Sequence, residues 1–93
     1  MDMFCTLVGT SFRGSEAKRL VNSMVPGDLI TLLAEQTNAY DSSAVAGYFC
    51  GEHVGYLSRE NNAEVATHLA TEGELTARVV DFESRKPVLL ITL

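Results

Sequence analysis

Basic residues are scarce in this chain. Seven Lys and Arg stand against twelve Asp and Glu, so the formal net charge is −5. A charge of this sign disfavours broad electrostatic adhesion to DNA, RNA or acidic membranes. Any nucleic-acid site therefore has to be local, with few phosphates neutralised at once.

Long apolar runs and cysteines are also few. No run approaches the roughly 18 residues of a membrane-spanning helix, and residues 1–4 lack the basic region of a signal peptide, so we expect a cytoplasmic protein with no membrane partner. Cys5 and Cys50 lie among strand-forming apolar residues, where we expect reduced and buried side chains. Cys50 and His53 supply two ligands where a structural zinc site needs four. We expect neither a metal nor another cofactor.

Apolar alternation and turn residues predict a mostly β chain. The 93 residues suffice for one domain, residues 1–93, with a modest core. We expect six short strands, over residues 4–8, 28–33, 44–50, 53–57, 75–82 and 88–93. Two short helices are expected, one capped by Ser15 and ending before Pro26, the other capped by Ser58 and reaching about Thr71. This pattern predicts a small antiparallel β-barrel with two short helices.

Glycines punctuate the predicted central hairpin. Gly47 is expected to weaken or bend the third strand. Gly51 favours a tight turn before the fourth strand, because such turns require positive φ. We expect this turn to set Tyr48 opposite Tyr56.

A polar turn, residues 37–43, carries the strongest candidate for a binding site. Its Asn, Asp and Ser side chains can bond nearby backbone N–H groups and fix the loop, which would hold Tyr40 and Asp41 outward as a ring and an acceptor. The alternative is a turn that only connects two strands, with Tyr40 partly buried and Asp41 as a cap.

The order of several segments resembles the HIRAN domain. The residues that carry the resemblance are, in order, Leu7-Val8-Gly9 and the aromatic Phe12, Pro26-Gly27-Asp28, Leu32 and Glu35, the pattern Asn38-x-Tyr40-Asp41-x-x-Ala44-Val45, and Val54-Gly55-Tyr56-Leu57. The resemblance implies a barrel of OB or SH3-like kind. In helicase-like chromatin-remodelling ATPases that barrel captures the 3′ end of single-stranded DNA, and this chain is similar to stand-alone bacterial and phage forms.

The resemblance also implies roles for particular residues. Phe12 and Tyr40 fall on base-stacking aromatics, and Asp41 falls on the carboxylate that meets the terminal hydroxyl. Asn38 falls at a position that shapes the turn or touches the last nucleotide, and Arg59 at a position where a basic residue can meet a phosphate. Ser11 stands where studied members carry a basic residue, so Arg13 is expected to supply that cation instead. Plainer readings make Phe12 a lid on the core and Arg59 a partner of Glu60 or Glu64.

These inferences predict a DNA-binding module rather than an enzyme. His53 and His68 lack a placed Ser or Cys partner, so no nucleophile–base pair is evident. The expected partner is the 3′ end of single-stranded DNA in repair or replication-fork processing, with a separate helicase or nuclease chain beside it. The rival is a protein-interaction module that binds a peptide in the same groove or pairs through the barrel edge. The apolar last strand, Val88–Leu93, would form a homodimer through that edge.

Overall fold

In the computed structural model, which describes residues 1–93, the expected architecture is confirmed. The chain forms a closed antiparallel barrel of six strands with two α-helices and one 3₁₀ turn. The elements are β1 (Asp2–Val8), η1 (Thr10–Phe12), α1 (Ser15–Ser23), β2 (Leu29–Ala34), β3 (Val45–Phe49), β4 (Glu52–Leu57), α2 (Asn62–Glu72), β5 (Leu75–Glu83) and β6 (Lys86–Thr92).

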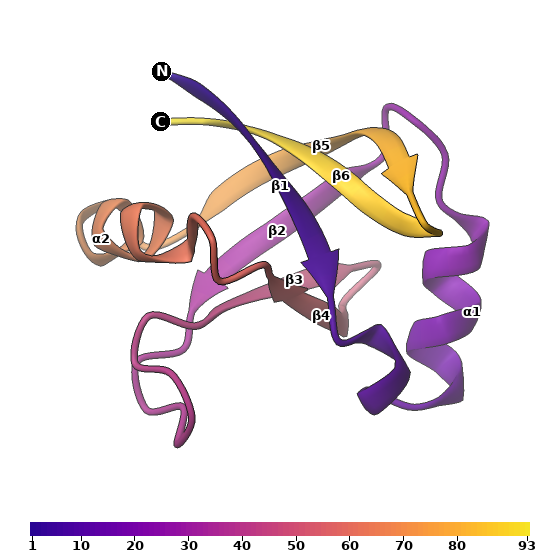
Figure 1. The fold of residues 1–93 in the computed structure, drawn as a ribbon, viewed down its shortest axis with the longest axis horizontal. Coiled ribbons are helices and arrows are strands. Elements are labelled where there is room, and N and C mark those ends of the chain that lie inside the picture. The colour runs from indigo at the N-terminus through magenta and orange to yellow at the C-terminus, as the bar shows by residue number, and fades with distance from the viewer.

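The strands close in the order β1-β4-β3-β2-β5-β6. Figure 1 shows α1 and α2 on opposite sides of the barrel and the two termini side by side, where the Met1 amino group donates to the Leu93 carbonyl at 2.9 Å. β6 pairs with β1 along one edge and with β5 along the other. The expectation of a free last-strand edge for a homodimer, or for pairing with a partner strand, is therefore wrong.

Alternate side chains along the strands point inward and fill the barrel. Along β6, Leu89 and Ile91 are fully buried while their neighbours are partly or fully exposed, which is the period of a sheet with one buried face. Leu7, Ile30 and Leu32 meet them from β1 and β2. Each such Leu or Ile contributes about 1.5–3 kcal/mol relative to an exposed side chain. The remaining fully buried large aliphatic side chains are Val45, Val54, Leu57, Val65 and Val79.

A pair of glycines lets the end of β1 lie close over β4. Gly47 and Gly55 are paired across β3 and β4. A Cβ at Gly55 would lie 2.6 Å from the Val8 carbonyl oxygen, and one at Gly47 would lie 2.9 Å from the Leu7 side chain. The Val8 carbonyl belongs to the backbone and cannot move aside, so glycine is required at position 55, whereas a side chain at position 47 would displace the end of the Leu7 side chain. The close approach positions the start of η1.

Two predicted helix caps are wrong. Ser15 is the first residue of α1, and its N-cap is Gly14, which makes no side-chain cap bond. Ser58 lies four residues before α2, because its backbone N–H bonds to the Thr6 carbonyl and extends the β1–β4 pairing. The helix begins at Asn62 after the N-cap Asn61.

The central hairpin also differs from expectation. A register shift after Gly47, the predicted bend, pairs Tyr48 with His53, while Tyr56 pairs with Ala46. The Tyr48 ring therefore stacks on His53, with centroids 5.0 Å apart, rather than facing Tyr56. The turn itself is Cys50-Gly51, so Cys50 is exposed, with φ 53°, and not buried as expected. Cys5 does lie in the core.

Candidate functional site

An open cavity of about 550 Å³, here called the end cavity, lies between the end of β1 and the β2–β3 loop. Five of the six residues expected to form a site line it, from three separate segments: Phe12 in η1, Asn38, Tyr40 and Asp41 in the loop, and Arg59 after β4. Arg13 does not. The other lining residues are Val8, Gly9, Ala44, Tyr56, Leu57 and Asn62.

Two aromatic rings stand free at this cavity. Tyr40 is 88% exposed and Phe12 is 84% exposed, the two most exposed large hydrophobic side chains of the chain. The alternative reading of Phe12 as a lid on the core is therefore wrong. An exposed ring loses no interior packing when a ligand stacks on it, and its face remains available.

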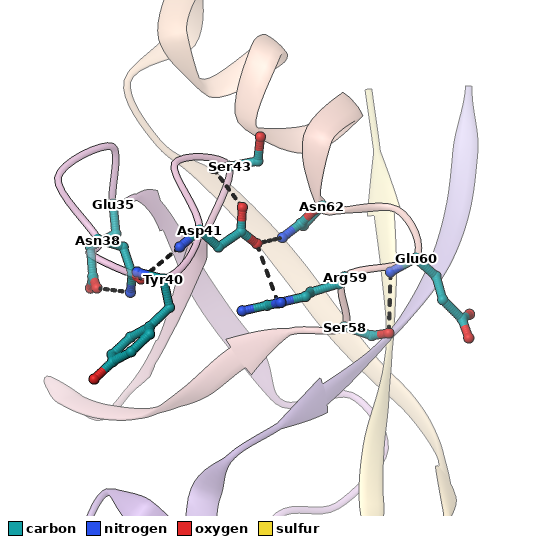
Figure 2. Close-up of polar contacts among 9 residues, drawn as sticks. All are labelled: Glu35, Asn38, Tyr40, Asp41, Ser43, Ser58, Arg59, Glu60 and Asn62. Carbon is teal, nitrogen blue, oxygen red and sulfur yellow. Dashed lines mark hydrogen bonds and ion pairs between the residues drawn. The ribbon is translucent and has the colours of Figure 1, made fainter.

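The β2–β3 loop is fixed by the side chain of Asn38. Its Oδ1 accepts the backbone N–H of Tyr40 at 2.8 Å and that of Asp41 at 3.1 Å. Its Nδ2 donates to Glu35 at 2.9 Å. Side-chain bonds of this kind replace the backbone partners that a loop lacks. The Asn38 bonds hold the backbone on both sides of the Tyr40 Cα while its ring extends away from the Asp41 carboxylate, as Figure 2 shows.

Asp41 is the most connected residue of the cavity. Its Oδ1 accepts the Ser43 N–H at 2.9 Å, its Oδ2 accepts the Asn62 amide at 2.7 Å, and Arg59 Nε lies 3.6 Å from Oδ2 (Figure 2). The Ser43 N–H, then the Asn62 amide and the Arg59 charge, lower the pKa of this carboxyl below its ordinary value. Asp41 thus caps the turn, as the alternative interpretation expected, and is also a charged acceptor at the cavity.

Arg59 lies against Asp41 and not against the neighbouring Glu60 or Glu64. The three ion pairs of the structure join Arg19 to Glu16, Arg59 to Asp41 and His68 to Glu72. The Arg59 side chain stays 72% exposed. Its guanidinium has five donors, so most remain available beside the carboxylate.

A second polar network lies behind the cavity floor. The Tyr56 hydroxyl donates to Glu35 at 2.7 Å. Burial raises the pKa of Glu35, but the hydrogen bonds from Tyr56 and Asn38 outweigh it, so the net pKa lies below the ordinary value. The same Tyr56–Glu35 bond raises the pKa of Tyr56. The edge of the Tyr56 ring contacts His53, with centroids 4.8 Å apart.

Arg13 takes part in this second network. Its Nη1 lies 2.8 Å from His53 Nδ1, and His53 Nε2 lies 3.0 Å from the Gly55 carbonyl oxygen. Since a neutral ring has one donor and one acceptor, Nδ1 accepts from Arg13 while Nε2–H donates to Gly55. Burial, and then the Arg13 charge, lower the pKa of His53, which keeps the ring neutral for this role.

Sequence reasoning missed Asn62, Glu35 and the role of Tyr56. Asn62 is the one buried polar residue of the chain and gives its amide to Asp41 from 21 positions away. Nothing in the neighbouring sequence distinguishes Asn62 from Asn61, because only the packing of α2 against the barrel brings Asn62 to the loop. Glu35 and Tyr56 stand inside the motifs that carry the family resemblance, and that is the signal that could have found them.

The site offers apolar faces, an acid and a guanidinium, but no metal-binding cluster. No three His, Cys, Asp or Glu side chains gather so that they could hold a metal ion. None of the helices has the length and apolar character needed to cross a membrane. What the arrangement can do chemically is offer an exposed ring face to a planar ligand and accept a hydrogen bond from a hydroxyl donor at the acid.

The HIRAN domain model matches residues 1–90 of this chain. A crystal structure of a protein from Lactobacillus plantarum has a TM-score of 0.78 and 22% identity, covering 99% of this chain and 100% of that one. The crystal structure of the HIRAN domain of human HLTF has a TM-score of 0.73 and 16% identity, covering 97% of this chain and 72% of that one. At such identities the likeness shows the fold. No curated protein matches this chain significantly in sequence.

Proposed function

This chain belongs to the HIRAN domain family, and from that premise we propose that it is a non-catalytic module that captures the 3′-OH end of single-stranded DNA. The observation that carries the proposal is that two freely exposed rings, Phe12 and Tyr40, line one cavity together with the charged acceptor Asp41. The three residues come from two loops far apart in the chain. Their presence around one open cavity is what supports an end-capture site.

The rings suit a nucleobase of any identity. Base–aromatic stacking contributes about 1–3 kcal/mol per base and tolerates every base, because each has a π-face. The floor of the end cavity is apolar at Val8, Ala44 and Leu57, so it supplies contact without base-edge hydrogen bonds. We therefore expect binding with little sequence preference.

Asp41 supplies the selection for an end. Its carboxylate has room for about four hydrogen bonds and accepts two from the protein. A free 3′-hydroxyl can donate to the remaining capacity, whereas a 3′-phosphate offers only repulsion to the ionised acid. Arg59, next to Asp41, has donors to spare for the phosphate one nucleotide upstream.

The test is fluorescence anisotropy at low salt with short single strands that end in 3′-OH, in 3′-phosphate or in a blocked hydroxyl. We expect the 3′-OH strand to bind roughly 10-fold more tightly than the phosphorylated one, about 1.4 kcal/mol for a single charge-assisted hydrogen bond. Equal and weak signals from all three strands would remove end capture and favour a peptide as the occupant of the cavity.

Asp41→Asn sharpens this test. The amide keeps an acceptor for Ser43 but loses the charge that repels a phosphate, so the preference for 3′-OH over 3′-phosphate should fall to about threefold or less. Ser42→Ala, an exposed position in the same loop, is the matched control and should keep the full preference. A preference that survives in Asp41→Asn would assign the discrimination to another group.

The proposed activity is binding alone. A separate helicase or nuclease chain would then act on the captured end in DNA repair or fork processing. Affinity capture from the native cell, with wild type and Tyr40→Ala as baits and with nuclease treatment as a second arm, tests this. Recovery of such an enzyme only while DNA is intact would support a DNA-bridged encounter, and recovery of none would count against the pathway.

A further inference from the structure

A second cavity, about 400 Å³ and here called the cationic groove, lies between α1 and the β5–β6 turn. Lys18 of α1 and Arg85 and Lys86 of the turn line it, together with no Asp or Glu. These are three of only seven basic residues in a chain with twelve acidic ones. Positive charge is therefore concentrated on one small surface of an otherwise acidic protein.

The three cations are free to meet a ligand. All three side chains are exposed, and the ion pairs of the structure use Arg19, Arg59 and His68 instead. Without a carboxylate partner, clustered cations of like sign repel one another. A bound anion would remove that repulsion.

The backbone at the groove points the same way. The turn between Glu83 and Lys86 has two residues, Ser84 with φ 51° and Arg85 with φ 68°. Positive φ at both positions is the pattern of a type I′ turn, for which Asn-Gly is the favoured sequence. An arginine there costs stability that glycine would not, although its side chain does line the groove.

The groove and the end cavity share a wall. Val8 and Gly9 line both of them, so the two lie on either side of the segment that joins β1 to η1. A strand whose last nucleotide occupies the end cavity can cross this segment and continue over Lys18, Arg85 and Lys86.

We propose that the cationic groove binds the backbone phosphates of the captured strand, upstream of its terminal nucleotide. The inference rests on the proposed end capture and adds the path that the strand takes. It also accounts for how a protein of net charge −5 retains a polyanion, because local cations release the counterions of only the phosphates they touch. The contribution is independent of base identity.

The experiment compares an oligothymidylate trinucleotide with a decanucleotide, both ending in 3′-OH, by anisotropy across a salt series. The wild type should bind the decanucleotide roughly 10-fold more tightly than the trinucleotide. The affinity for the decanucleotide should also fall more steeply with salt than the affinity for the trinucleotide. The two slopes of log affinity against log salt concentration should differ by about 2, since three phosphates contribute about 0.7 each.

Substitution of the three cations isolates the groove. Lys18→Gln/Arg85→Gln/Lys86→Gln should bind the trinucleotide as the wild type does and lose the roughly 10-fold gain with length. Arg78→Gln removes a cation of β5 that is exposed and lines neither cavity, so it is the control for the loss of a positive charge elsewhere on the surface. Arg78→Gln should retain the gain.

Arg85→Gly separates binding from folding. Glycine suits the positive φ at this position, so the variant should melt no lower than the wild type while binding the decanucleotide about threefold more weakly. Unchanged decanucleotide affinity, with a raised melting temperature, would assign Arg85 to the turn alone and contradict the proposal.

The outcomes also distinguish the two proposals. If the trinucleotide binds and Tyr40→Ala abolishes that binding, but length adds nothing, the groove is refuted and end capture stands. If the trinucleotide does not bind while the decanucleotide does, and the triple variant loses it, end capture is refuted and the groove stands.

Discussion

The two walls of the end cavity hold their aromatic rings with different firmness. On the Tyr40 wall, the β2–β3 loop, Asn38 accepts two backbone N–H groups and Asp41 accepts a third. On the Phe12 wall, the segment of η1, one side chain bonds to the backbone, from Thr10 Oγ1 to the Val54 carbonyl at 2.7 Å, and the Phe12 and Arg13 N–H groups bond within the segment to the Gly9 and Thr10 carbonyls.

Glycines widen this difference. Gly9, with φ 77°, and Gly14, with φ 101°, bracket the Phe12 wall, and glycine is the residue with the most backbone freedom to lose. The Tyr40 wall contains none. We infer that the Tyr40 wall is preorganised beside Asp41, and that under the proposed function the Phe12 wall adjusts when a ligand binds.

The largest expected effect is on the preorganised wall. Tyr40→Ala should weaken binding of a 3′-OH strand by roughly 10-fold or more, because one stacking face is lost without any ordering penalty to recover. Anisotropy measures the affinity and thermal melting checks the fold. Tyr40→Phe keeps the ring, and its binding should stay within about twofold of the wild type. Equal losses in both variants would mean that the hydroxyl, not the ring, makes the contact.

Loss of the loop fixation should have the next largest effect. Asn38→Ala leaves the Tyr40 and Asp41 N–H groups without their acceptor, so affinity should fall about fivefold and the free energy of unfolding by about 1–2 kcal/mol. Denaturant unfolding and anisotropy give the two numbers, with Ser42→Ala as the loop control. An affinity unchanged in Asn38→Ala would show that preorganisation does not matter.

Phe12→Ala should lower the affinity for a 3′-OH strand less than Tyr40→Ala does, by about threefold. Part of the stacking energy on this wall is offset by ordering a glycine-flanked segment when the base binds. The same anisotropy series measures it. A loss in Phe12→Ala larger than that in Tyr40→Ala would reverse the comparison between the walls.

The smallest expected effect is a pH dependence of the Phe12 wall. The pKa of His53 is lowered in the folded protein, so its stabilising bond from Arg13 is fully present above the unfolded pKa, about 6.5. It is lost as pH falls from there through the lower folded pKa, since the unfolded chain then binds the proton more readily. Melting temperatures measured from about pH 7.5 down to about pH 5, the range in which histidine side chains titrate, should show the decline.

His53→Gln should flatten that decline, and His68→Gln should not. His68 lies on α2 beside Glu72 and contacts neither Arg13 nor Tyr56. A decline that persists in His53→Gln but disappears in His68→Gln would place the titrating group on α2.

Much of this fold was readable from local pattern. All six strands, both helices and the bend at Gly47 were expected within a few residues of where they lie, because alternation and turn chemistry act between neighbours. The start of α2 was misplaced because a distant contact intervened: the bond from the Ser58 N–H to the Thr6 carbonyl keeps the chain in the sheet beyond its local signal.

By itself the sequence determined the barrel class and a polar turn that presents Tyr40 and Asp41, since both rest on residues close together in the chain. It also determined the family, because the order of several short motifs along the chain identifies it. Only the tertiary structure decided that Asn62 docks on Asp41, that Arg13 turns to His53 and away from the end cavity, and that Lys18 and Arg85 line one groove. These pairs are 21, 40 and 67 positions apart. Closure of the barrel sets such distances, and no short-range preference encodes them.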